Sequence, residues 1–127
     1  MELVKKRVLV AEDDRFLRRA CEAGLRRLGI TVFTAVDGEE ALKIARSQPL
    51  DLILLDLLMP KLSGIEVLRV IRSEETMRSI PVVILTNSSR EQDADEVNRL
   101  GIEGYHVKAD LSLEKLGEQV KRLLLKE

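Results

Sequence analysis

Five short apolar runs alternate along the chain with longer segments of helical period, and this alternation constrains the fold more than any other feature. The runs cover residues 7–11, 31–35, 52–55, 81–85 and 104–107. The first, third and fourth are nearly continuous in apolar character, which is typical of parallel strands covered on both faces. The alternation predicts a single α/β domain over residues 1–127, with one parallel sheet between two layers of helices.

Residues that favour helix ends mark the limits of the helical segments. N-caps are predicted at Asp37 and near Ser112, and capping boxes at Ser63 with Glu66 and at Ser89 with Gln92. Gly29 is placed to end the first helix. The last helix is predicted to bury Leu113, Leu116, Val120, Leu123 and Leu124.

The composition removes several classes of protein. Lys plus Arg number 21 and Asp plus Glu number 22, so the net charge is −1, without the strongly basic face of a non-specific nucleic-acid binder. The single cysteine cannot build an internal disulfide framework or a Cys-rich zinc site, which favours a reducing cytoplasm. No apolar run approaches the roughly 20 residues that span a bilayer. We therefore expect a soluble cytoplasmic domain that contacts neither nucleic acid nor membrane directly.

Polar residues follow four of the five predicted strands, at the edge where ligands of open parallel sheets bind. The first run leads into Glu12 and Asp13, the third into Asp56, the fourth into Thr86 and the fifth into Lys108. Three acids crowded at one edge repel one another, and a single ammonium cannot balance them. Mg²⁺ accepts carboxylate oxygens, keeps several waters and commonly binds a phosphate oxygen as well. The pattern predicts a Mg²⁺ site with room for a phosphoryl group.

Asp56 is the strongest candidate for a phosphoryl acceptor at that edge. A carboxylate beside Mg²⁺ can form an acyl phosphate, and the transfer needs positioning and positive charge rather than a general base. Asp56 directly follows an apolar run, so the sheet would hold it rigidly, while Thr86 and Lys108 supply a hydroxyl and an ammonium. Taken singly, each of these residues fits a turn or surface position, and Asp14 fits a helix N-cap. Their joint placement carries the functional interpretation.

Four segments in register resemble the receiver domain of two-component response regulators. They are residues 8–14, residues 51–60 with Ser63 and Gly64, residues 83–86 and residues 104–108, and the likeness covers essentially the whole chain. The resemblance implies a flavodoxin-like (βα)5 fold of three layers, with sheet order 2-1-3-4-5. It also implies a regulatory phosphoacceptor of the single-domain, chemotaxis-receiver-like type, which catalyses only its own phosphorylation and dephosphorylation.

The resemblance assigns a role to each matching residue. Asp56 would accept the phosphoryl group from the phosphohistidine of a sensor kinase or phosphotransfer protein. Glu12, Asp13, Asp56 and the Leu58 backbone carbonyl would hold Mg²⁺. Thr86 and Lys108 would contact the phosphoryl group. The Tyr105 side chain would turn inward once Thr86 has moved. The face of the fourth helix, fifth strand and fifth helix would then bind a downstream protein or a second copy of the chain.

Three positions depart from the pattern of that family. Ala109 follows Lys108 where receivers usually have a proline joined by a cis bond. A cis bond before a residue other than proline costs about 3–4 kcal/mol, which favours a trans bond and a different loop here. Asn87 is larger than the usual residue after the threonine and would narrow access to the phosphoryl site. Glu12 replaces the commoner aspartate, a change that we expect to be harmless.

Other interpretations compete with a working receiver. A degenerate receiver would act as a phosphorylation-independent interaction or dimerisation module, and Asn87 and Ala109 favour it. A phosphatase with an aspartyl-phosphate would need a second acid two residues after Asp56, where the chain has Leu58. A flavodoxin-type carrier would need a hydroxyl- and Gly-rich phosphate loop after the first strand, where the chain has acids. The sequence leaves open whether the chain is a stand-alone receiver or part of a longer regulator.

Overall fold

The computed structural model describes residues 2–126, which form five strands and five helices in strict alternation. The strands are β1 (Arg7–Ala11), β2 (Thr31–Ala35), β3 (Leu52–Asp56), β4 (Val82–Thr86) and β5 (Gly104–Val107). The helices are α1 (Arg15–Arg27), α2 (Gly38–Ser47), α3 (Gly64–Ser73), α4 (Glu91–Leu100) and α5 (Leu113–Leu125). Two 3₁₀ turns cover Glu2–Lys5 and Lys108–Asp110. The predicted order of elements is confirmed.

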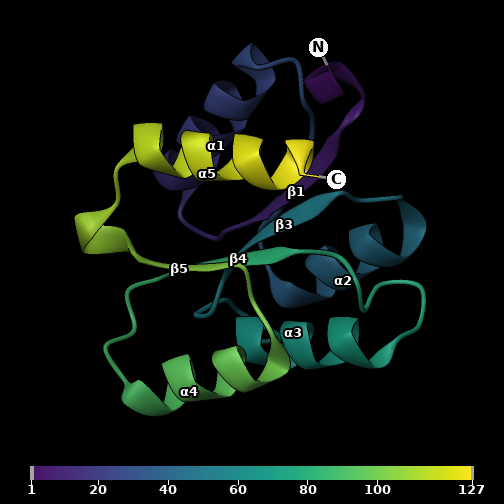
Figure 1. Ribbon diagram of the computed structural model, residues 1–127. Coiled ribbons are helices and arrows are strands. Elements are labelled where there is room, and N and C mark those ends of the chain that lie inside the picture. Colours follow the sequence, from purple (N-terminus) through teal and green to yellow (C-terminus); the bar gives the residue numbers. More distant parts are fainter. Residues whose placement is uncertain (1, 127) are drawn as a thin grey trace.

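The strands form one parallel sheet in the order β2-β1-β3-β4-β5. Helices α1 and α5 cover one face of this sheet, and α2, α3 and α4 cover the other (Figure 1). This is the predicted three-layer flavodoxin-like arrangement. Register aligns Ala11 with Leu55 and Thr86 with Val107, so the residues that follow these positions meet at one edge.

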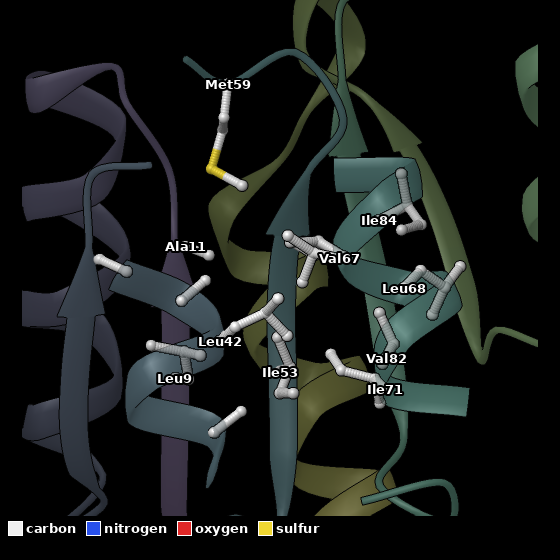
Figure 2. Close-up of a cluster of buried hydrophobic side chains, with 14 of the residues drawn as sticks. Leu9, Ala11, Leu42, Ile53, Met59, Val67, Leu68, Ile71, Val82 and Ile84 are labelled. Atoms are coloured by element: carbon white, nitrogen blue, oxygen red, sulfur yellow. The ribbon is translucent and has the colours of Figure 1, made fainter. Parts of the chain in front are cut away.

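The central strands β1, β3 and β4 supply the middle of the core, and their residues alternate between two apolar clusters. Leu9, Ile53 and Ile84 face α2, α3 and α4, and Figure 2 shows Leu9 near Leu42 and Ile84 near Leu68. The other cluster contains the intervening strand residues together with residues of α1 and α5. Every residue of β3 and β4 is buried, which explains why both runs are apolar up to their final residue.

Most helix ends lie where the sequence predicts them. Asp14, Asp37 and Ser112 cap α1, α2 and α5, and Ser63 and Glu66 form the predicted capping box of α3. Gly29 follows α1 with φ +89°, a conformation that favours glycine.

The predicted capping box of Ser89 and Gln92 is wrong. Helix α4 has Arg90 at its N-cap without a side-chain cap. The Ser88 hydroxyl accepts the Arg90 N–H at 3.2 Å and donates to Asp93 Oδ2 at 2.6 Å. The serine that organises this helix start is therefore one residue earlier than the pattern suggests.

The predicted burial of Leu113 is also wrong. Leu116, Val120 and Leu124 are buried and Leu123 packs against them, but Leu113 is 46% exposed. Leu113 is the first residue of α5 and lines an open hollow between α1 and α5. Among residues 2–126, no helix is long and apolar enough to cross a bilayer.

Candidate functional site

The carboxyl edge of the sheet gathers the polar residues that follow β1, β3, β4 and β5. Glu12 and Asp13 follow β1, Asp56 and Thr86 are the last residues of β3 and β4, and Lys108 follows β5. One carboxylate oxygen from each of Glu12, Asp13 and Asp56 lies within 4.8 Å of the others. The structure thus brings together the three acids that the sequence singles out, with Lys108 among them.

Glu12 is fully buried and is fixed by several hydrogen bonds. Its Oε2 accepts from the Asp14 backbone N–H at 2.9 Å and from Lys108 Nζ at 2.7 Å. Its backbone N–H donates to the Ala35 carbonyl at 3.0 Å. The second carboxylate oxygen, Oε1, is buried without a partner. An unpartnered buried carboxylate oxygen is costly, and a bound cation would compensate that cost.

Asp56 is 1% exposed, and like Glu12 it has one buried carboxylate oxygen without a hydrogen-bond partner. Its Oδ1 accepts from the Leu58 N–H at 3.1 Å. Its Oδ2 lies 3.1 Å from Lys108 Nζ but without hydrogen-bond geometry, and has no hydrogen-bond partner. Burial raises the pKa of Asp56 to about 7; the Leu58 N–H opposes this rise, and the charge of Glu12 adds to it. The charge of Lys108, which lowers this pKa, is too weak to offset the burial of Asp56.

Lys108 is the cation that the structure places between the acids. Burial alone would lower its pKa, but the hydrogen bond to Glu12 and the charge of Asp56 raise the pKa above its ordinary value. Lys108 is therefore a fixed positive charge at neutral pH. The bond between Lys108 and Ala109 is trans, as are all peptide bonds in residues 2–126, and a 3₁₀ turn leads from Lys108 towards α5.

Thr86 is the last residue of β4, and Tyr105 lies on the neighbouring strand β5. Thr86 is fully buried, and its Oγ1 accepts the Ser88 backbone N–H at 2.9 Å. Tyr105 is half-buried and packs against the cluster on the α2–α4 face; burial raises its pKa, and the charge of Asp93 adds to the effect. Asn87 is exposed between Thr86 and the start of α4.

The donor set fits Mg²⁺. Three carboxylates converge, two of them present buried oxygens without hydrogen-bond partners, and Lys108 supplies one balancing charge. Hard oxygen ligands with partial solvent access are what Mg²⁺ requires, and the exposed Asp13 leaves the third ligand open to water. Leu58, the fourth predicted ligand, follows Asp56 by two residues with its side chain 55% exposed.

Sequence reasoning missed two residues of this edge. Arg18 Nη1 donates to the backbone carbonyls of Glu12 at 2.9 Å and Asp13 at 3.3 Å, and so supports the acidic segment from α1. Ser88 holds Thr86 through its backbone N–H. Helical spacing places Arg18 on the polar face of α1, but no pattern in the sequence indicates that its guanidinium folds back onto the loop.

Comparisons with known proteins identify the family. The family model described as "Response regulator receiver domain" matches residues 8–121. The chain is 37% identical to the alkaline phosphatase synthesis transcriptional regulatory protein PhoP of Bacillus subtilis over 95% of its own length and 49% of that protein. It is 38% identical to the probable transcriptional regulator ycf27 of Cyanophora paradoxa, with 98% and 50% covered. The chain spans about half the length of these relatives.

Solved structures agree with this. The Francisella response regulator 1452 receiver domain superimposes with a TM-score of 0.84 at 30% identity, covering 94% of this chain and 97% of that one. The receiver domain of sensor histidine kinase PA1611 from Pseudomonas aeruginosa, solved with a magnesium ion in its active-site cleft, superimposes with a TM-score of 0.83 at 30% identity and the same coverage.

These matches exclude the flavodoxin and phosphatase interpretations. The matches give no support to a degenerate receiver either. The residues that the sequence predicts for a working site are all present at the carboxyl edge, namely Glu12, Asp13, Asp56, Thr86 and Lys108. The family model, the curated relatives and the solved structures agree over nearly the whole chain. The chain belongs to the receiver domains of response regulators.

Proposed function

We propose that Asp56 accepts a phosphoryl group from the phosphohistidine of a sensor kinase or phosphotransfer protein, with Mg²⁺ held by Glu12, Asp13, Asp56 and the Leu58 carbonyl. One observation carries this proposal: Asp56 Oδ2 is buried without a hydrogen-bond partner, 3.1 Å from Lys108 Nζ and beside two further acids. That oxygen is available to react, and its surroundings are suited to a cation.

The transfer balances without a general base. A carboxylate oxygen of Asp56 attacks phosphorus, the bond from phosphorus to the histidine nitrogen breaks, and the electron pair returns to the imidazole, which takes its proton from solvent. The bound Mg²⁺ would supply charge neutralisation for the phosphoryl oxygens. Lys108 is already beside Oδ2 and offers its ammonium to the same oxygens without a large movement.

Thr86 and Tyr105 would transmit phosphorylation to the surface. Thr86 Oγ1 accepts a hydrogen bond from the Ser88 N–H in this structure, and the hydroxyl would exchange it for a bond to a phosphoryl oxygen. Tyr105, on the neighbouring strand, would fill the space that Thr86 leaves. The face of α4, β5 and α5 would then bind a downstream protein or a second copy of the chain. The added dianionic phosphoryl group would cause this by favouring one of two conformations of the domain.

The wider setting belongs to the same proposal. We expect these residues to work in the cytoplasm, where sensor kinases obtain ATP. PhoP and ycf27 are transcriptional regulators of about twice this length. In a longer protein of that type, contact with nucleic acid would belong to a further domain and would follow from the switch described here.

Phosphorylation by a small phosphodonor tests the proposal directly. Incubation of the chain with the donor and Mg²⁺ should add one phosphoryl group to the intact mass. Asp56→Asn should abolish the addition, whereas Asp95→Asn, at an exposed acid of α4, should leave it unchanged. An unmodified mass, under conditions that label another receiver domain, would contradict the proposal.

A further inference from the structure

The loop between β3 and α3, residues 57–63, contains a strained turn. Lys61 has φ +69°, the only positive value at a residue other than glycine within residues 2–126. The Leu62 N–H donates to the Pro60 carbonyl at 2.7 Å, so Lys61 is the centre of a γ-turn. A side chain with a Cβ atom adopts this conformation only where its surroundings impose it. We call residues 57–63 the acceptor loop, because it directly follows Asp56.

Both ends of the acceptor loop are fixed to the core. Leu57 and Met59 are buried, with Leu58 exposed between them, and Figure 2 shows Met59 above the cluster with its sulfur directed inward. The Gly64 N–H donates to the Leu57 carbonyl at 2.9 Å. A Cβ at Gly64 would lie 2.1 Å from the Asp56 carbonyl oxygen, so the start of α3 packs directly on the end of β3.

The start of α2 holds the middle of the acceptor loop. The Gly38 N–H donates to the Pro60 carbonyl at 3.4 Å, and a Cβ at Gly38 would lie only 2.0 Å from the Leu62 carbonyl oxygen. Lys61 Nζ lies 3.6 Å from Asp37 Oδ2, the carboxylate that caps α2 through its other oxygen. A separate helix therefore imposes the shape of the turn by close backbone contact.

We propose that Gly38 and Lys61 are positioning residues of the magnesium site, which they influence through the acceptor loop without contacting the ion. The proposal rests on the function proposed above, because Leu58 is there the source of one ligand. Leu58 lies between two anchored side chains, and its N–H donates to Asp56 Oδ1 at 3.1 Å. A change of backbone at residues 60–62 can be absorbed only by moving Leu58 or by releasing Leu57 and Met59.

Two substitutions of Lys61 separate backbone conformation from charge. Lys61→Gly and Lys61→Val both remove the exposed ammonium, but only glycine accepts φ +69° readily. Lys61→Gly should keep the wild-type Mg²⁺ affinity, measured by titration calorimetry. Lys61→Val should weaken it by at least about tenfold, the effect expected when the support of a metal ligand is lost. Equal affinities in the two variants, whether retained or lost, would overturn the proposal.

A substitution on α2 tests the contact across elements. Gly38→Ala should also weaken Mg²⁺ binding by at least about tenfold, because the added methyl displaces Leu62. Gly24→Ala is the matched control, since a Cβ at Gly24 meets nothing within 4 Å and α1 lies on the other face of the sheet. Wild-type Mg²⁺ affinity in a folded Gly38→Ala variant would overturn the proposal, and if that variant does not fold the Lys61 pair decides.

Amide NMR spectra without metal separate this proposal from the proposed function. The Asp56 and Leu58 resonances should shift in Lys61→Val and stay in place in Lys61→Gly. If they do not move in Lys61→Val, the positioning role is refuted even where the wild-type chain binds Mg²⁺ and becomes phosphorylated. If the wild-type chain binds no Mg²⁺, the proposed function fails, and the same shifts still decide whether the turn positions Leu58.

Discussion

Lys108 Nζ donates a hydrogen bond to Glu12 at 2.7 Å, but forms only an ion pair, at 3.1 Å, with Asp56, the proposed phosphoryl acceptor. The Glu12 side chain is fully buried and that of Lys108 is 14% exposed, so this pair is the main charge compensation among the site residues. The Lys108 ammonium therefore neutralises part of the negative charge that a bound Mg²⁺ would otherwise neutralise. Lysine and metal ion should compete for the acids and yet both assist phosphoryl transfer.

Lys108→Met should separate these two effects. Removing the ammonium relieves its repulsion of the ion, so Mg²⁺ should bind about tenfold more tightly, while phosphorylation by a small donor slows by at least about tenfold. Titration calorimetry and intact-mass kinetics measure the two effects. Lys115→Met, at an exposed position of α5, should change neither. Weaker Mg²⁺ binding in Lys108→Met would show that Lys108 does not compete with the ion.

The pKa of Asp56 makes stability depend on pH. Its pKa rises from an ordinary 3.8 to about 7, first because of burial, so the folded chain binds this proton more tightly than the unfolded chain does. The contribution of Asp56 to the free energy of unfolding is fully present below its unfolded-state pKa of 3.8. It is lost as the pH rises through the folded-state pKa of about 7. Asp56→Asn should therefore raise the free energy of unfolding by about 1–3 kcal/mol at about pH 8 and by less at about pH 5.

Urea unfolding without divalent cations measures this difference, and Asp95→Asn is the control. Saturating Mg²⁺ should remove much of the advantage of Asp56→Asn, because the ion stabilises the wild-type carboxylate and binds the variant more weakly. An advantage that does not depend on pH would mean that relief of desolvation at Asp56 is not its cause.

Helix capping predicts that substitution of two serines affects stability to different extents. Ser63→Ala should lower the free energy of unfolding by about 1 kcal/mol, because its hydroxyl accepts the Glu66 N–H at 3.3 Å and completes a capping box. Ser89→Ala should change it by less than about 0.5 kcal/mol, since the described structure has no cap at that residue. Equal losses in urea unfolding would mean that Ser89 does cap α4.

The capping residues show where sequence reasoning succeeds. A cap at Ser63 needs only local spacing, and spacing is readable in the sequence. At α4 the same spacing fits Ser89, but Ser88 is the residue whose hydroxyl contacts Arg90 and Asp93. Two adjacent serines offer two registers, and the path of the chain out of β4 decides between them.

Some features of the candidate site were likewise predictable from the sequence, and others were not. Glu12, Asp56 and Thr86 were predictable because each stands where a buried apolar run ends, and parallel strands bring such ends to one edge. The preference of Lys108 for Glu12 depends on side-chain geometry that no spacing encodes. The positive φ of Lys61 was equally hidden, because lysine carries no preference for it and the contact with Gly38 crosses from another helix.

Two glycines within helices offer a gain in stability. Gly24 of α1 and Gly117 of α5 line the same open hollow of about 420 Å³, and a Cβ at either position meets no atom within 4 Å. Alanine restricts the unfolded chain more than glycine does and favours a helix, so each substitution should raise the free energy of unfolding by about 0.5–1 kcal/mol. The effects should add in the double variant, because each new methyl points into open space.

Gly29→Ala should instead lower the free energy of unfolding, since Gly29 has φ +89° and its Cβ would lie 2.9 Å from Val4. Urea unfolding measures all four variants, and a loss of stability in Gly24→Ala or Gly117→Ala would show that the hollow is closed in solution.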